Sequence, residues 1–117
     1  MVSELEKYKN ATVTGSAKQQ MVFVLDEMLK LLFQAKAAME KQDYETKFKA
    51  LSKVTDGLYI LRSGIDPDLD ANTKMLHDFY SVTIDKLEQI NLSGKDPEEL
   101  QLVISTITQL NTACSAD

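Results

Sequence analysis

The sequence has few of the residues that build covalent, metal or catalytic centres. Its 117 residues include one cysteine and one histidine, and no tryptophan. Cys114 alone can form neither an intrachain disulfide nor a cysteine cluster for zinc. With His77 as the only imidazole, the chain lacks the repeated Glu-x-x-His of di-iron bundles and the second ligand of a bis-histidine haem. No glycine-rich phosphate loop is present, and we interpret His77 as a solvated helix residue. We therefore expect no enzymatic activity and no cofactor.

Basic charge and long apolar runs are also scarce. The chain has 13 Lys and Arg against 18 Asp and Glu, a formal net charge of -5. This balance disfavours nucleic acid and anionic membranes as partners, because both need a basic surface. The longest apolar run is far shorter than a bilayer span, and the first residues are too polar for a signal peptide. We expect a cytoplasmic protein without membrane insertion. Its 44% hydrophobic content can form the core of a single domain.

The strongest apolar pattern covers residues 16–41. Ser16 and Gln19 have the spacing of a capping box, which predicts that a helix starts there. An inner row recurs at alternating steps of four and three, and further apolar residues widen it on both sides, so this helix should contact more than one neighbour. Phe23 lies instead in the polar stripe. It is either a single exposed aromatic or a residue covered by the N-terminal arm or by a partner. The inner row is Met21, Leu25, Met28, Leu32, Ala35 and Met39.

Three more helices follow. Asp43 is a good N-cap for the second, which should end where Gly64 takes a left-handed conformation, ahead of Pro67. The third should run from about Asp70 to Ser93, with Phe79 and Val82 extending its apolar surface sideways. The predicted inner row of the second helix is Tyr44, Phe48, Leu51, Leu58 and Ile65; that of the third is Leu69, Thr73, Leu76, Tyr80, Thr83, Leu87 and Ile90.

The start of the fourth helix has the strongest local signal in the chain. Asp96 can act as N-cap and Pro97 occupies the first helical position. Because the connections are short and no segment alternates like a strand, the sequence predicts an all-α fold, an antiparallel four-helix bundle. We expect residues 16–117 to form this single domain.

Residues 1–15 are predicted to be an N-terminal arm, either a short helix or an extended segment, with Leu5 and Tyr8 as apolar anchors. The alternative is a frayed terminus. The apolar rows exceed what one four-helix core consumes, which predicts a groove for an amphipathic partner helix. The candidate partner-binding residues are Leu5, Tyr8, Phe23, Phe79 and Val82.

A series of short strings, in chain order, resembles the flagellar export chaperone family FliS. The junction from Met39 to Tyr44 is similar to the family's Ile-Glu-x-Gly-Asp-Tyr, and Ile65-Asp66-Pro67 is similar to its Leu-Asp-Pro turn. The other strings are Val13-Thr14 before Ser16, Leu25-Asp26 with Leu29 and Leu32, Leu76-His77-Asp78-Phe79-Tyr80, Leu87-Glu88-Gln89-Ile90-Asn91, and Asp96-Pro97. The series spans nearly the whole chain. It departs from the family pattern at Ala17 and Asp26 and lacks a C-terminal tryptophan.

The resemblance implies a cytoplasmic, non-enzymatic chaperone that binds the C-terminal helical segment of flagellin. It would keep flagellin monomeric and deliver it to the flagellar type III export gate. Leu5-x-x-Tyr8 matches the family's aliphatic-x-x-Tyr, which is associated with the contact to an export-gate component. The alternative is another helical adaptor or secretion chaperone that binds an amphipathic partner helix. The sequence does not define the oligomeric state.

Overall fold

The protein is an all-α bundle, as predicted. The computed structural model describes residues 17–115, with side chains described for residues 19–113. Leu5, Tyr8 and the predicted arm 1–15 lie outside these residues. Within 17–115 there is no strand, and no helix is both long and apolar enough to cross a membrane. The four helices are α2 (Ala17–Glu40), α3 (Tyr44–Ser63), α4 (Ala71–Ser93) and α5 (Pro97–Ser115).

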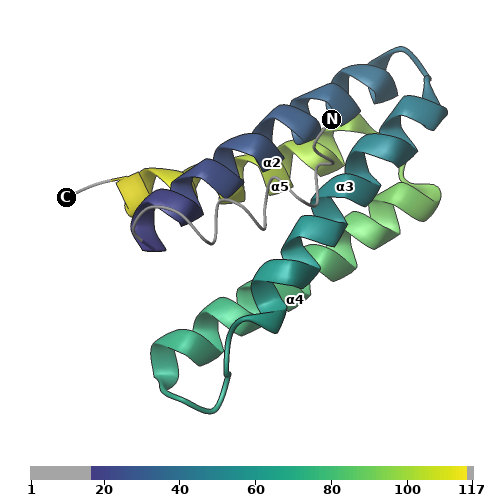
Figure 1. The fold of residues 1–117 in the computed structure, drawn as a ribbon. Helices are drawn as coiled ribbons and strands as arrows, with labels where there is room; N and C mark the ends of the chain where they lie inside the picture. The colour runs from purple at the N-terminus through teal and green to yellow at the C-terminus, as the bar shows by residue number, and fades with distance from the viewer. Residues whose placement is uncertain (1–16, 116–117) are drawn as a thin grey trace, which may run out of the picture.

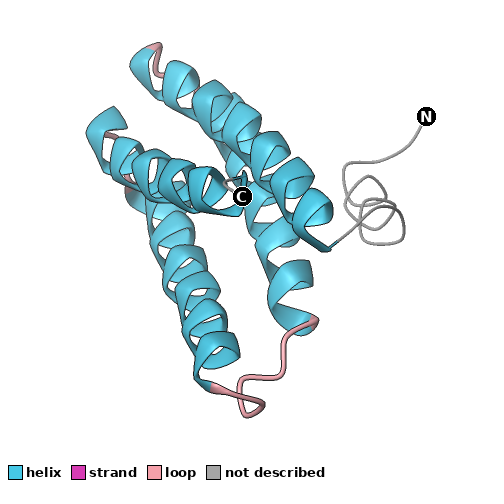
Figure 2. Cartoon of the chain, turned by 90° about the vertical axis from the view of Figure 1, so that its left-hand side faces the viewer, coloured by secondary structure: helices cyan, strands magenta, loops and turns pink. Residues whose placement is uncertain are grey.

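The helices are joined by short connections and successive helices run antiparallel (Figure 1). Helix α2 packs against both α3 and α5, and α4 packs against α3. Contacts between α4 and α5 are the fewest of the four neighbouring pairs, although a short turn joins these two helices. The pairs α2–α5 and α3–α4 diverge away from the end of the bundle that carries the α2–α3 and α4–α5 turns (Figure 2).

Three helices begin at the aspartates that the sequence singled out. The Asp43 carboxylate accepts bonds from the backbone N–H and the hydroxyl of Thr46, at 3.2 and 2.7 Å. These two bonds, the hydroxyl first, lower the pKa of Asp43. Asp70 and Thr73 form a reciprocal capping box at the start of α4. The Asp96 carboxylate accepts a backbone N–H in the first turn of α5 at 2.9 Å. Such bonds satisfy donors that lack an intrahelical partner.

The turn between α2 and α3 places a non-glycine residue in the left-handed region. Gln42 has φ 60°. The Asp43 N–H bonds to the carbonyl of Ala38 at 2.8 Å, and the Gln42 N–H bonds to that of Met39 at 3.1 Å. This is the Schellman pattern, in which the left-handed residue is usually glycine. Gln42 therefore adopts a conformation that costs an L-residue free energy.

We expect Gln42→Gly to stabilise the protein by up to about 1 kcal/mol, because glycine adopts positive φ without the clash of a Cβ atom. Urea unfolding measures the change. Gln34→Gly is the matched control, since Gln34 is an exposed residue inside α2, and this substitution should destabilise by about 1 kcal/mol. A loss of stability in Gln42→Gly would contradict the argument.

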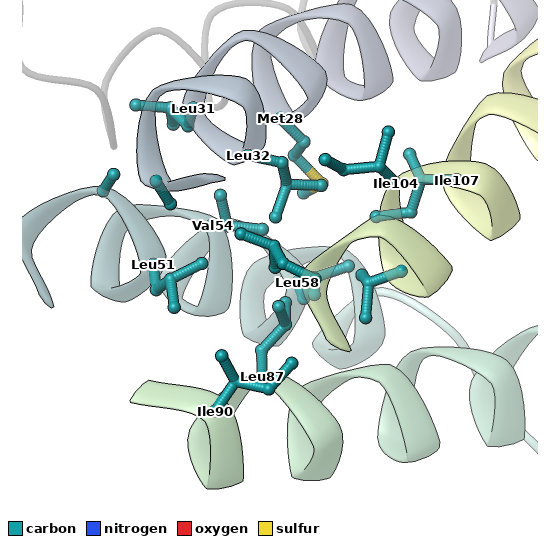
Figure 3. Close-up of a cluster of buried hydrophobic side chains, with 14 of the residues drawn as sticks. Met28, Leu31, Leu32, Leu51, Val54, Leu58, Leu87, Ile90, Ile104 and Ile107 are labelled. Carbon is teal, nitrogen blue, oxygen red and sulfur yellow. The ribbon is translucent and has the colours of Figure 1, made fainter. Parts of the chain in front are cut away.

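The hydrophobic core lies where all four helices meet (Figure 3). Met28 and Leu32 of α2 face α5, and the centre is completed by Val54 of α3 and Leu87 of α4. The predicted inner row of α2 is buried from Leu25 onward. The fully buried large side chains are Leu25, Met28, Leu32, Leu51, Leu58, Tyr80, Ile84, Leu87, Ile90, Leu100 and Ile107.

Four details of the predicted pattern are wrong. Tyr44 and Phe48 are exposed, because the inward positions in the first turns of α3 belong to Lys47 and Ala50. Leu69 is also exposed, since it lies in the loop before α4 rather than on its inner face. Gly64 has φ -87°, so α3 ends without a left-handed residue.

Lys47 is a buried lysine that joins α3 to the end of α4. Its Nζ atom donates to the backbone carbonyls of Ile90 at 3.0 Å and Gly94 at 2.9 Å. Gly94 approaches Ile90 so closely that a Cβ on Gly94 would stand 2.9 Å from the Ile90 Cα. Burial lowers the pKa of Lys47, the charge of Lys95 lowers it further and that of Glu99 opposes both. Lys47 therefore holds the turn from which α4 and α5 diverge.

We expect Lys47→Met to lower the free energy of unfolding by about 1–3 kcal/mol, because the buried Gly94 carbonyl loses its donor while the apolar stem is kept. Thermal and urea unfolding measure this loss. Lys53→Met, an exposed position on the same helix, should change stability by less than about 0.5 kcal/mol. Equal effects of the two substitutions would show that the bonds to α4 contribute nothing.

Candidate functional site

A groove of about 410 Å³ lies between α4 and α5. These are the two neighbouring helices that pack least against each other. Val82 and Leu102 form its two walls and are 68% and 69% exposed, whereas Thr83 and Val103 are buried beneath them. The complete lining is Asp78, Phe79, Val82, Thr83, Lys86, Leu102, Val103 and Thr106. We call this the α4–α5 groove.

The lining is more apolar than its composition suggests, because its two threonine hydroxyls bond within their own helices. The Thr83 hydroxyl donates to the Phe79 carbonyl, and the Thr106 hydroxyl to the Leu102 carbonyl, both at 2.8 Å. Their hydrogen-bonding capacity is thus partly used inside the protein. A ligand that enters the groove would meet a surface dominated by aliphatic and aromatic carbon, which favours burial of its own apolar side chains.

One charge of each sign lies on the α4 wall. Asp78 and Lys86 are eight residues apart on one helix face, which corresponds to about 12 Å along the axis. Asp78 is paired with Lys74 at 3.1 Å. Among the residues described, Lys86 has no carboxylate within ion-pair distance. A partner can therefore gain from a carboxylate placed near Lys86.

The structure brings together two of the predicted site residues. Phe79 and Val82 both line the α4–α5 groove. Phe23 is 39% exposed on α2 and does not line the groove, while Leu5 and Tyr8 lie outside the described residues. Leu102 was missed, although it is the main apolar residue of the opposite wall. Its signal was the spacing of Leu102 and Thr106, four residues apart on α5 and beside the buried row of Leu100, Val103 and Ile107.

Comparison with known proteins settles the family. The model of the family described as flagellar protein FliS matches residues 1–115. The chain belongs to the FliS family. No curated protein matches it. FliS proteins are a family of flagellar chaperones rather than enzymes, and the apolar α4–α5 groove is suited to holding a protein segment.

Proposed function

We propose that this FliS protein acts in the cytoplasm as an export chaperone that binds the C-terminal helical segment of flagellin in the α4–α5 groove. The observation that carries the proposal is the pair of exposed apolar walls at Val82 and Leu102 on two helices that pack poorly against each other. Family membership supplies the class of client. A segment that is disordered before assembly needs an apolar surface to replace its later contacts, and the groove offers one.

Calorimetric titration with a synthetic flagellin C-terminal segment tests this proposal. We expect a 1:1 complex with a negative heat-capacity change, because apolar surface becomes buried on both partners. A scrambled peptide of the same composition is the control. Absence of binding at tens of micromolar, or equal binding of the scrambled peptide, would refute the proposal.

We further propose that Leu5 and Tyr8 provide the contact with an export-gate component, through which the bound flagellin is delivered. The support is their match to the aliphatic-x-x-Tyr of the family. Tyr8→Ala should weaken binding to that component at least tenfold and leave the affinity for the flagellin segment unchanged, since hot-spot tyrosines at interfaces contribute about 2 kcal/mol or more. Pull-down and calorimetry measure the two affinities. Unfolding at a much lower temperature would instead assign Tyr8 a structural role.

A further inference from the structure

A second surface lies on the other side of α4, where it faces α3. Two adjoining hollows of about 380 and 250 Å³ share Glu88 and Asn91 in their lining. The residues that define this α3–α4 surface are Phe48, Ser52, Asp56 and Tyr59 of α3, and Glu88, Asn91 and Leu92 of α4. None of them lines the α4–α5 groove, so the two sites can be occupied together.

The end of the α3–α4 surface near the α4–α5 turn is apolar and uncovered. Phe48 is 59% exposed and Leu92 is 88% exposed, the largest fraction among the big apolar side chains described. Both line the same hollow. Because this aromatic and this aliphatic side chain are both exposed and line one hollow, an apolar side chain of another molecule can pack against them.

The middle of the surface holds an acceptor that the described residues leave unpaired. The Asn91 Nδ2 atom donates to the Ser52 hydroxyl at 3.3 Å, but the buried Oδ1 atom has no partner within residues 19–113. Buried polar atoms are generally hydrogen-bonded. This unpaired acceptor lies beneath the part of the surface that the two hollows share.

The second hollow carries acidic side chains. Asp56 and Glu88 are both exposed and line the second hollow, to which no lysine or arginine contributes. Glu88 accepts the Tyr59 hydroxyl at 2.7 Å, and this bond raises the pKa of Tyr59. Arg62, the single arginine of the sequence, stacks on the Tyr59 ring at 4.8 Å and donates to Ser81. Two carboxylates with no cation between them complement a basic group.

We propose that the α3–α4 surface is a second docking site, for a basic amphipathic helix of another protein. One apolar side chain of that helix packs on Phe48 and Leu92, and a lysine or arginine one to two turns away pairs with Glu88 and Asp56. Phe48 and Tyr59 are eleven residues apart on α3, or about 16 Å along its axis, which matches three turns of a helix. A second copy of this chain is a poorer occupant, because the same surface on that copy offers no lysine or arginine to Asp56 and Glu88.

The test uses a synthetic 18-residue helical peptide with leucines on one face and lysines beside them, titrated into the uniformly 15N-labelled full chain. A peptide with glutamates in place of the lysines is the control. We expect amide shifts at Phe48, Asn91 and Leu92 with the lysine peptide, and no binding of the glutamate peptide. Shifts confined to the α4–α5 groove, or the absence of shifts at millimolar peptide, would overturn the proposal.

Charge-reversal variants separate this docking from general attraction to an acidic protein. The double variant Asp56→Lys, Glu88→Lys should bind the lysine peptide at least tenfold more weakly than the unmodified protein does. Glu40→Lys with Asp68→Lys changes the net charge equally at exposed positions outside the surface, and should change affinity less than twofold. Equal losses of affinity for the lysine peptide in the two variants would refute the site. A protein that is dimeric in sedimentation equilibrium, and that Leu92→Asp makes monomeric, would also refute it, because the surface would then bind a second copy of the chain. Both variants should bind the flagellin segment with the same affinity, because the substitutions lie outside the α4–α5 groove. The two proposals can therefore fail separately: if the unmodified protein does not bind the flagellin segment, the lysine peptide can still bind the α3–α4 surface.

Discussion

Introducing a carboxylate on each wall of the α4–α5 groove, by Val82→Asp with Leu102→Asp, should weaken binding of the flagellin C-terminal segment by at least about 30-fold. The physical reason is that each carboxylate would have to be buried without a partner when the segment covers the walls, and a loss of about 2 kcal/mol or more is typical at the centre of an interface. Because Val82 and Leu102 are exposed in the free protein, the fold should tolerate both changes. Calorimetry at fixed salt measures the affinity.

A single substitution elsewhere provides the matched control for this variant. Leu69 is 70% exposed, much like each of the two groove residues, but it lies in the loop before α4 and outside the groove. Leu69→Asp should change affinity less than twofold. The thermal midpoint of both variants should stay close to that of the unmodified protein. Equal affinity of the double variant and the unmodified protein would place flagellin on another surface.

The helices could be predicted from sequence because their signals are local. Asp43, Asp70 and Asp96 each offer a carboxylate to donors within the next three residues, so the start of each helix depends on neighbours in sequence. A break at Gln42 and Asp43 could be predicted, but the left-handed conformation of Gln42 could not, because a glutamine carries no signal of positive φ. Its geometry follows from the bonds that close the end of α2 onto the start of α3.

The inward faces were less predictable, because they depend on how neighbouring helices meet. Periodicity assigned Phe48 to the core, whereas the structure buries Lys47 and exposes Phe48. The periodicity of apolar residues does not reveal that two backbone carbonyl groups at the end of α4 accept hydrogen bonds from the Lys47 amine. The misplaced Phe48 then becomes part of the α3–α4 surface.

The sequence predicted an apolar groove, but only the residues of its α4 wall. Surplus apolar residues on α4 identified Phe79 and Val82, since both lie beside a complete inner row. The opposite wall required knowledge of how α4 and α5 are placed, which brings Val82 and Leu102 into the lining of one groove. That placement is a property of the packed bundle, in which α2 separately contacts α3 and α5. Pattern alone therefore indicated that a groove exists without giving both of its sides.

The face of α2 that stabilises the bundle can be tested with two adjacent residues. Leu32 is fully buried where α2 meets α3 and α5, and Phe33 is more than half exposed. Leu32→Ala should lower the free energy of unfolding by about 2–5 kcal/mol, because it removes buried methyl groups and leaves a cavity. Phe33→Ala should cost less than about 1 kcal/mol, although it deletes the larger side chain, since most of that ring already contacts solvent. Urea unfolding of the two variants gives both values. A loss below about 1 kcal/mol for Leu32→Ala would mean that α2 presents a different face to the core.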